Sequence, residues 1–384
     1  MTYRGSGSLQ TGNTFQMGIG KAFTLFTKMN LTVSKDTDPI ASQTVSENHL
    51  TDVLAEKARR ENFNVVSKLL PEGIKEHLTN IYNYCRYIDD IGDLSLGKRE
   101  ENLRRAEQDL KEALDGATSN KIFSAIATTV KKTSAPEQNL FDLIEANFMD
   151  QTIKKYDTFE QLCDYCKLSA NPVGRLVLAA FGAYNDENAK LSDLICTSLQ
   201  IIEHLQDIAE DYAEGRIYLP KEDLEKFHVE ESMLEGKART SKAKSKLFEL
   251  DFNRDVPAIA DELKRLLSFE CGRARQLMLE GSPLLNALPS VAAKVAIAGF
   301  IGGGLAQLEA IEKSNYNVIN IEIKASKISV VLNSLKMFAR TYLYKTVAYE
   351  PKNSSVEKDT SQELDSYLKK MGFLPKSYIS RWLR

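Results

Sequence analysis

Apolar and polar residues recur with a helical period along most of the chain. From about Thr51 onward, apolar residues occupy positions i, i+3, i+4 and i+7, the pattern of a helix with one buried face. A representative run carries Ile74, Leu78, Ile81, Tyr82 and Ile88. The two-residue alternation of a half-buried strand is almost absent. The pattern therefore predicts an all-α protein.

Proline divides this helical sequence into segments of ordinary length. The main breaks fall at Pro71, Pro136, Pro172, Pro220, Pro257, Pro283 and Pro289. About ten to twelve helices are expected from these breaks. No motif repeats at a fixed period, which favours a single helical bundle. The apolar run Val291–Leu308 contains Lys294 and four glycines, and we interpret it as a packed internal helix.

The composition changes at both ends of the helical region. Residues 1–45 are rich in Gly, Ser, Thr and Asn, so we expect a mobile leader. Residues 46–325 form the predicted helical domain, and residues 326–384 a partly helical extension with a basic end. The segment from Tyr367 to Arg384 is basic and apolar without an acid, which is compatible with a peripheral membrane contact. Docking on its own bundle, on a homodimer partner or on a pathway enzyme is the alternative.

Overall charge and cysteine content argue against several classes of protein. The chain has 50 Lys and Arg against 53 Asp and Glu, so the charge balance does not favour a nucleic-acid partner. Cys163 and Cys166 form a lone CxxC, and a structural zinc site needs a second ligand pair. An odd set of five cysteines and no recognisable secretory signal predict a cytoplasmic protein, membrane-associated only through its basic end.

Two acidic stripes are the unusual feature of the sequence. Asp89 and Asp93 stand four residues apart, and Glu203, Asp207 and Asp211 extend the same spacing over two helical turns. Each pair of like charges at this spacing destabilises a helix by roughly a few tenths of a kcal/mol. One such stripe is most often a solvated face. Two stripes set in apolar sequence favour a functional site.

The chemistry that needs this arrangement is departure of a diphosphate. Mg²⁺ prefers oxygen ligands and binds through carboxylates together with substrate phosphate oxygens. Two facing acidic helices can hold two or three Mg²⁺ ions and a diphosphate. Arg86 and Arg216 can add charge-assisted hydrogen bonds to the phosphates.

Loss of a diphosphate leaves a carbocation, which needs shielding from water and an aromatic or hydroxyl neighbour. Tyr165 precedes a predicted helix break at Pro172, and the small residues Ser169, Ala170 and Gly174 surround that break. These residues could make room for a polyprenyl chain. A helix kink packed against a neighbouring helix is the plainer interpretation.

These motifs resemble the squalene/phytoene synthase family over roughly Glu61 to Val318. The matching segments are Glu61–Phe63 with Leu69–Pro71, Cys85–Asp93, and Gln206–Asp211 with Gly215–Pro220. The resemblance implies a single helical bundle of the isoprenoid synthase type with a central cavity, formed by residues 46–325. It also implies a Mg²⁺-dependent enzyme acting on prenyl diphosphates.

The resemblance assigns roles residue by residue. The implied Mg²⁺ ligands are Asp89, Asp93, Asp207 and Asp211, and Tyr165 is the implied tyrosine of the cation steps. The implied substrate-binding residues are Asn62, Phe63, Arg86, Asn171, Gln200, Arg216 and Tyr218. Glu203 departs from the family, which has Asn at this position. Glu203 can still bind Mg²⁺, although with a different local geometry.

Three segments are most similar to the hydroxysqualene synthases: Ser169–Gly174, Glu203–Asp207 and Ala298–Gly304. The implied reaction ionises presqualene diphosphate, rearranges the carbocation and quenches it with water to give hydroxysqualene. No nicotinamide is expected, and no Gly-rich dinucleotide fingerprint follows a strand.

Three alternatives stay open at this stage. Head-to-head condensation of farnesyl or geranylgeranyl diphosphate would give a squalene or phytoene precursor. A terpene cyclase would use the same metals on a single diphosphate. A non-catalytic scaffold would be expected to lose motif carboxylates, whereas Asp89, Asp93, Asp207 and Asp211 are all present.

Overall fold

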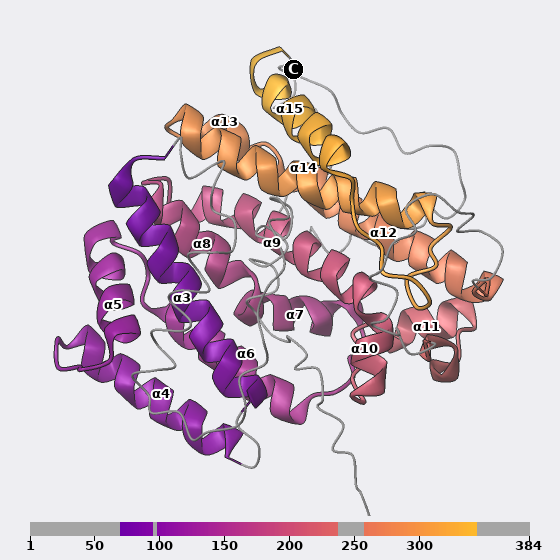
Figure 1. Cartoon of the computed structure of the whole chain (residues 1–384), viewed down its shortest axis with the longest axis horizontal. Coiled ribbons are helices and arrows are strands. Elements are labelled where there is room, and N and C mark those ends of the chain that lie inside the picture. The colour runs from indigo at the N-terminus through magenta and orange to yellow at the C-terminus, as the bar shows by residue number, and fades with distance from the viewer. Residues whose placement is uncertain (1–69, 95–97, 237–256, 344–384) are drawn as a thin grey trace, which may run out of the picture.

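The computed structural model describes residues 70–94, 98–236 and 257–343, where the chain is all-α as the sequence predicts (Figure 1). The elements are α3 (Glu72–Leu94), α4 (Arg99–Leu114), α5 (Lys121–Thr133), α6 (Gln138–Thr152), α7 (Phe159–Ser169), α8 (Asn171–Ala180), α9 (Asp186–Gln206), α10 (Ile208–Ala213), α11 (Lys221–Phe227), the 3₁₀ turn η2 (Glu231–Leu234), α12 (Asp261–Gly281), α13 (Leu284–Ala287), α14 (Val291–Lys313) and α15 (Lys327–Leu343). Extended pairing in these ranges is limited to an isolated bridge between Lys155 and Ile217.

Helices α9 and α12 form the centre of the bundle. They pack along each other, and the Ser198 hydroxyl donates a 2.6 Å hydrogen bond to the Ala274 carbonyl oxygen between them. Figure 1 shows α3 to α6 on one side of this pair and α14 and α15 on the other. Most side chains of α9 are buried, so its polar residues project into the interior.

Local sequence signals set the helix ends. Four helices, α5, α7, α9 and α14, begin at a side-chain oxygen that accepts a hydrogen bond from a backbone N–H of the first turn. The capping residues are Asn120, Thr158, Asn185 and Ser290. The predicted break at Pro172 is confirmed, because α7 ends at Ser169 and α8 begins with Pro172 in its first turn.

Helix α14 is an internal helix, as its lysine and glycines suggested. Among the described residues it is the one helix long and apolar enough to cross a membrane, yet 67% of its most apolar window is buried. A Cβ atom added at Gly302 would overlap the backbone nitrogen of Ser334, so the backbones of α14 and α15 approach closely there. Glycine is required at this contact because a side chain would separate the two helices.

A buried ion trio ties α11 to α12. Arg273 donates to Asp223 at 2.8 Å and to Glu270 at 2.9 Å, and its guanidinium lies 4.0 Å from the Phe159 ring centroid and 4.5 Å from that of Phe269. Fully ionised, the trio has one positive and two negative charges. Burial raises the pKa of Glu270 to about 8, although Arg273 opposes the rise.

This pKa predicts a pH-dependent stability. The folded protein binds the Glu270 proton more tightly than the unfolded chain does, so stability is full below the ordinary pKa of 4.5 and falls until about pH 8. The loss is at most about 1.4 kcal/mol for each pH unit. Urea unfolding across this range should show a smaller decline for Glu270→Gln than for the wild type. Equal declines would contradict the assignment.

Candidate active site

Helix α6 connects the two acidic segments. The amide nitrogen of Gln151 donates a long, 3.4 Å hydrogen bond to the carbonyl oxygen of Gly92, in the first acidic segment. A Cβ atom at Gly92 would overlap Oδ1 of Asn147, so α3 and α6 are in close contact there. The neighbouring residue Asp150 accepts a 3.2 Å hydrogen bond from Tyr218, which follows the second acidic segment. Adjacent α6 residues therefore contact the first acidic segment and Tyr218, which follows the second.

Asp150 is the buried acceptor of two phenols. Tyr165 donates to its Oδ2 at 2.9 Å, and Tyr218 donates to its Oδ1 at 3.2 Å. Burial raises the pKa of Asp150, while the hydrogen bonds from both tyrosines act in the opposite direction. Burial raises the pKa of Tyr165 and of Tyr218 well above that of a free phenol. Both tyrosines therefore remain neutral hydrogen-bond donors.

An aromatic cluster surrounds these tyrosines. The His204 ring stacks on Tyr218 with centroids 3.7 Å apart and an angle of 11° between the planes. Tyr156 stacks on Tyr218 at 5.7 Å and lies 5.6 Å from Tyr165. His204 also links the cluster to α9 and α10: its Nε2 is 3.1 Å from the amide nitrogen of Gln200, and its Nδ1 is 3.8 Å from Asp211. Three predicted residues, Tyr165, Tyr218 and Gln200, thus share one site.

The second acidic stripe is not on one continuous helix, and the sequence interpretation is wrong on that point. Helix α9 ends at Gln206 and α10 starts at Ile208, because Asp207 between them has a φ of −102°. The backbone hydrogen bonds nevertheless continue: Asp207 N–H donates to Glu203 and Asp211 N–H donates to Asp207, at 3.0 and 2.8 Å. The four-residue spacing therefore survives the break.

The acidic residues supply oxygen atoms that suit a hard cation. Asp89, Glu203 and Asp211 are buried, and Asp207 is partly exposed. Within the described ranges, no three His, Cys, Asp or Glu side chains are gathered as a preformed metal site. The donor set is composed of carboxylates, which matches the preference of Mg²⁺. The side chain of Asp93, at the end of α3, lies outside the described residues.

Positive charge gathers beside the Tyr218 segment. Burial works against the charge of Arg216, but Tyr218, Glu214 and Asp211 raise its pKa. The Arg216 Nε is buried and makes no hydrogen bond within the described part of the chain. Burial lowers the pKa of Lys154, and the charge of Arg216 lowers it further. The charge interaction with Arg216 thus adds Lys154 to the predicted Arg216 as a second cation that a bound anion would stabilise.

The remaining predicted residues are distributed differently. Arg86 pairs with Asp90 at 2.9 Å, one helical turn further along α3. Asn171 is buried and accepts a 3.1 Å hydrogen bond from Thr197 on α9. Asn62 and Phe63 fall outside the described residues, as do the leader and the basic end. These observations leave the proposed substrate roles of Arg86 and Asn171 as predictions.

Sequence reasoning missed Asp150, His204, Tyr156 and Lys154. His204 directly follows Glu203 in the second acidic segment, and an aromatic, titratable side chain at that position was the signal in the sequence that pointed to it. Asp150 belongs to no stripe or motif. Its importance follows from two hydrogen bonds to residues 15 and 68 positions away in the sequence. Local periodicity does not reveal contacts of that range.

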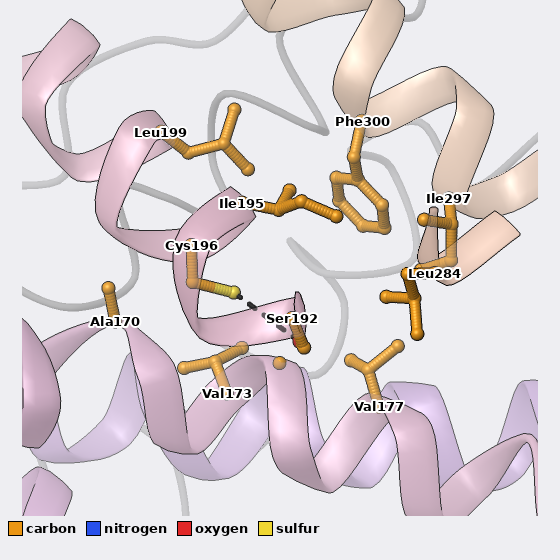
Figure 2. A pocket seen from close by; sticks show the side chains of 11 residues that line it. Ala170, Val173, Val177, Ser192, Ile195, Cys196, Leu199, Leu284, Ile297 and Phe300 are labelled. Atoms are coloured by element: carbon orange, nitrogen blue, oxygen red, sulfur yellow. Dashed lines mark hydrogen bonds between the residues drawn. The ribbon is translucent and has the colours of Figure 1, made fainter. Parts of the chain in front are cut away.

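An apolar cavity adjoins the Pro172 break (Figure 2). It lies among α8, α9, α13 and α14, and its empty space is about 490 Å³ when the solvent at its mouth is included. Its lining residues are Ala170, Val173, Gly174, Val177, Ser192, Ile195, Cys196, Leu199, Leu284, Ile297 and Phe300. Figure 2 shows the Phe300 ring beside Ile195, opposite the α8 side chains. The absence of a side chain at Gly174 matters, because a Cβ there would overlap the Ser192 hydroxyl.

Comparison with known proteins identifies what this chain resembles. The family described as squalene/phytoene synthase matches residues 57–329. A hydroxysqualene synthase from Zymomonas mobilis is 31% identical over 172 residues, which cover 43% of this chain and 56% of that protein. The chain thus spans little more than half the length of this curated relative.

Two solved structures share the fold. The squalene synthase HpnC from Alicyclobacillus acidocaldarius is 36% identical with a TM-score of 0.59, covering 70% of this chain and 96% of that one. A dehydrosqualene synthase solved with a ligand has a TM-score of 0.64 at 21% identity, covering 77% of this chain and 97% of that one. The second likeness concerns the fold alone.

The Asp150 network predicts a specific loss of stability. Asp150→Ala should lower the free energy of unfolding by about 1–3 kcal/mol, because two buried phenols lose their acceptor. Asp150→Asn keeps an acceptor oxygen and should cost less. The matched control is Asp164→Ala, which removes an exposed partner of Lys167 and should change stability by about 0.5 kcal/mol or less. Urea unfolding measures all three, and equal effects of both alanine variants would refute the network.

Proposed function

Because this chain belongs to the squalene/phytoene synthase family, we propose that it converts presqualene diphosphate to hydroxysqualene. The single observation that supports this site most strongly is the convergence on α6. Gln151 contacts the first acidic segment, while Asp150 holds Tyr165 and the Tyr218 segment that follows the second. The proposed reaction consumes one water and releases hydroxysqualene, diphosphate and a proton.

The diphosphate would bind at the acidic and basic side chains described above. Arg216 and Lys154 would bind phosphate oxygens, and the unsatisfied Nε of Arg216 is a donor for this purpose. Mg²⁺ would be held by Asp89, Asp207 and Asp211, together with Asp93 and Glu203. The bound ions would neutralise the charge of the departing diphosphate.

The aromatic cluster would stabilise the carbocation. The faces of Tyr165 and Tyr218 carry negative quadrupole charge, which attracts a nearby cation. Their hydroxyl hydrogens point to Asp150, so each phenol is fixed in orientation by a buried carboxyl group. Because burial keeps both phenols neutral, neither becomes a phenolate that would combine with the cation.

The apolar cavity would receive a prenyl chain. It lies beside Ala170 and Gly174, a few residues after Tyr165 along the chain. Its walls come from four helices, and Phe300 closes one side (Figure 2). Apolar walls exclude the water that would otherwise quench a carbocation early.

Condensation of two farnesyl or geranylgeranyl diphosphates is the second candidate. The observation that favours it is similarity to a phytoene synthase of Mycobacterium tuberculosis, at 28% identity over 183 residues. The same carboxylates and cations would serve this reaction, so its chemistry at the diphosphate is shared.

Product analysis separates these reactions. The protein is incubated with Mg²⁺ and presqualene diphosphate, and in parallel with farnesyl diphosphate, without nicotinamide. We expect hydroxysqualene from presqualene diphosphate, identified by mass, with its oxygen derived from labelled water. Presqualene diphosphate or a longer prenyl product from the parallel incubation would support condensation. No turnover of either substrate would contradict both the hydroxysqualene reaction and the condensation of farnesyl diphosphate.

A further inference from the structure

Helix α15 exposes an apolar stripe to solvent. Ile328, Val331, Leu332 and Leu335 are 73%, 55%, 60% and 58% exposed, and they follow the i, i+3, i+4, i+7 spacing of one helix face. Scattered apolar residues are normal on a surface, but a contiguous stripe marks an interaction site. The stripe therefore needs a partner.

The opposite face of α15 is already occupied by α14. Asn333 donates to Glu309 of α14 at 3.1 Å, Met337 is buried, and Ser334 lies against Gly302. These contacts fix the rotation of α15, since residues four apart share a face. The apolar stripe consequently faces outward in a defined orientation.

The charges of α15 select the class of partner. The helix has no Asp or Glu between Lys327 and Leu343. Successive residues turn by about 100°, so Lys327 and Lys336 flank the stripe on its two sides. Both lysines lie on exposed parts of the helix. This is the arrangement of a helix that lies in the interface of an anionic membrane.

We propose that this face of α15 docks on an anionic phospholipid surface. The branched side chains of Ile328, Val331, Leu332 and Leu335 would enter the acyl boundary, and the flanking lysines would contact lipid phosphates. A second copy of the chain is a poorer partner. A two-fold contact through the stripe would bring the lysines of both copies together, and like charges repel.

The position of α15 suits an enzyme whose product is apolar. Helix α14 contacts α15 and also supplies Ile297 and Phe300 to the apolar cavity. A membrane at α15 would thus be one helix away from the proposed prenyl site. This consequence rests on the proposed function, whereas the docking itself does not.

Vesicle sedimentation of the full chain tests the docking. Wild type should pellet with vesicles of phosphatidylglycerol and phosphatidylcholine, and much less with phosphatidylcholine alone. Each lysine near the surface contributes about fivefold to partitioning, so Lys327→Glu with Lys336→Glu should weaken it by about 25-fold or more. Leu332→Ser with Leu335→Ser should weaken it by about tenfold or more.

The matched control changes Lys131 and Lys132 of α5 to Glu, the same change in net charge on a helix far from α15 (Figure 1). It should bind nearly as wild type does. Three results would overturn the proposal. The wild-type protein could stay in the supernatant, or it could form a dimer that is lost only in the Leu332→Ser, Leu335→Ser variant. The α15 variants could also bind the vesicles as the wild type does. The last would place the contact elsewhere, for example at residues 367–384.

Turnover of detergent-dispersed substrate is measured in parallel. The α15 variants should keep wild-type turnover, which shows that their loss of binding is not a loss of folding. If wild type lacks turnover but binds vesicles, only the proposed function fails.

Discussion

The site depends on one buried carboxyl group. Asp150 accepts hydrogen bonds from Tyr165 and Tyr218, which lie on different segments, and its neighbour Gln151 contacts the first acidic segment. Burying a carboxyl group is unfavourable unless it is hydrogen-bonded, so the tyrosines and Asp150 constrain one another. Removing either the Asp150 carboxyl group or the tyrosine hydroxyls would leave a buried polar group without its partner. This mutual requirement holds Tyr165 and Tyr218 against α6.

A second buried acidic group has a different purpose. Glu270 and Asp223 share Arg273, whose guanidinium is covered by two phenylalanine rings. That trio joins α11 to α12 and lies among core residues. At Asp150, by contrast, the surrounding groups are two tyrosines, a histidine and the cation Arg216. The difference in surroundings, rather than burial, distinguishes the structural cluster at Glu270 from the proposed reactive one at Asp150.

Much of the fold could be predicted from sequence because it is encoded locally. The helical period, the break at Pro172 and the internal character of α14 each follow from neighbouring residues, and the structure confirms them. The roles of Asp150 and His204 could not be predicted, because they arise from contacts between distant segments. The interruption at Asp207 was also missed, since a four-residue spacing does not reveal a change of backbone angle.

The central claim is that both acidic segments serve one diphosphate site. Calorimetric titration of inorganic pyrophosphate, with and without Mg²⁺, tests it most directly. We predict binding that requires Mg²⁺ and that weakens at least about tenfold in Asp89→Asn and in Asp211→Asn, while Asp164→Asn binds as wild type. Binding without Mg²⁺, or a site indifferent to either motif variant, would contradict the account.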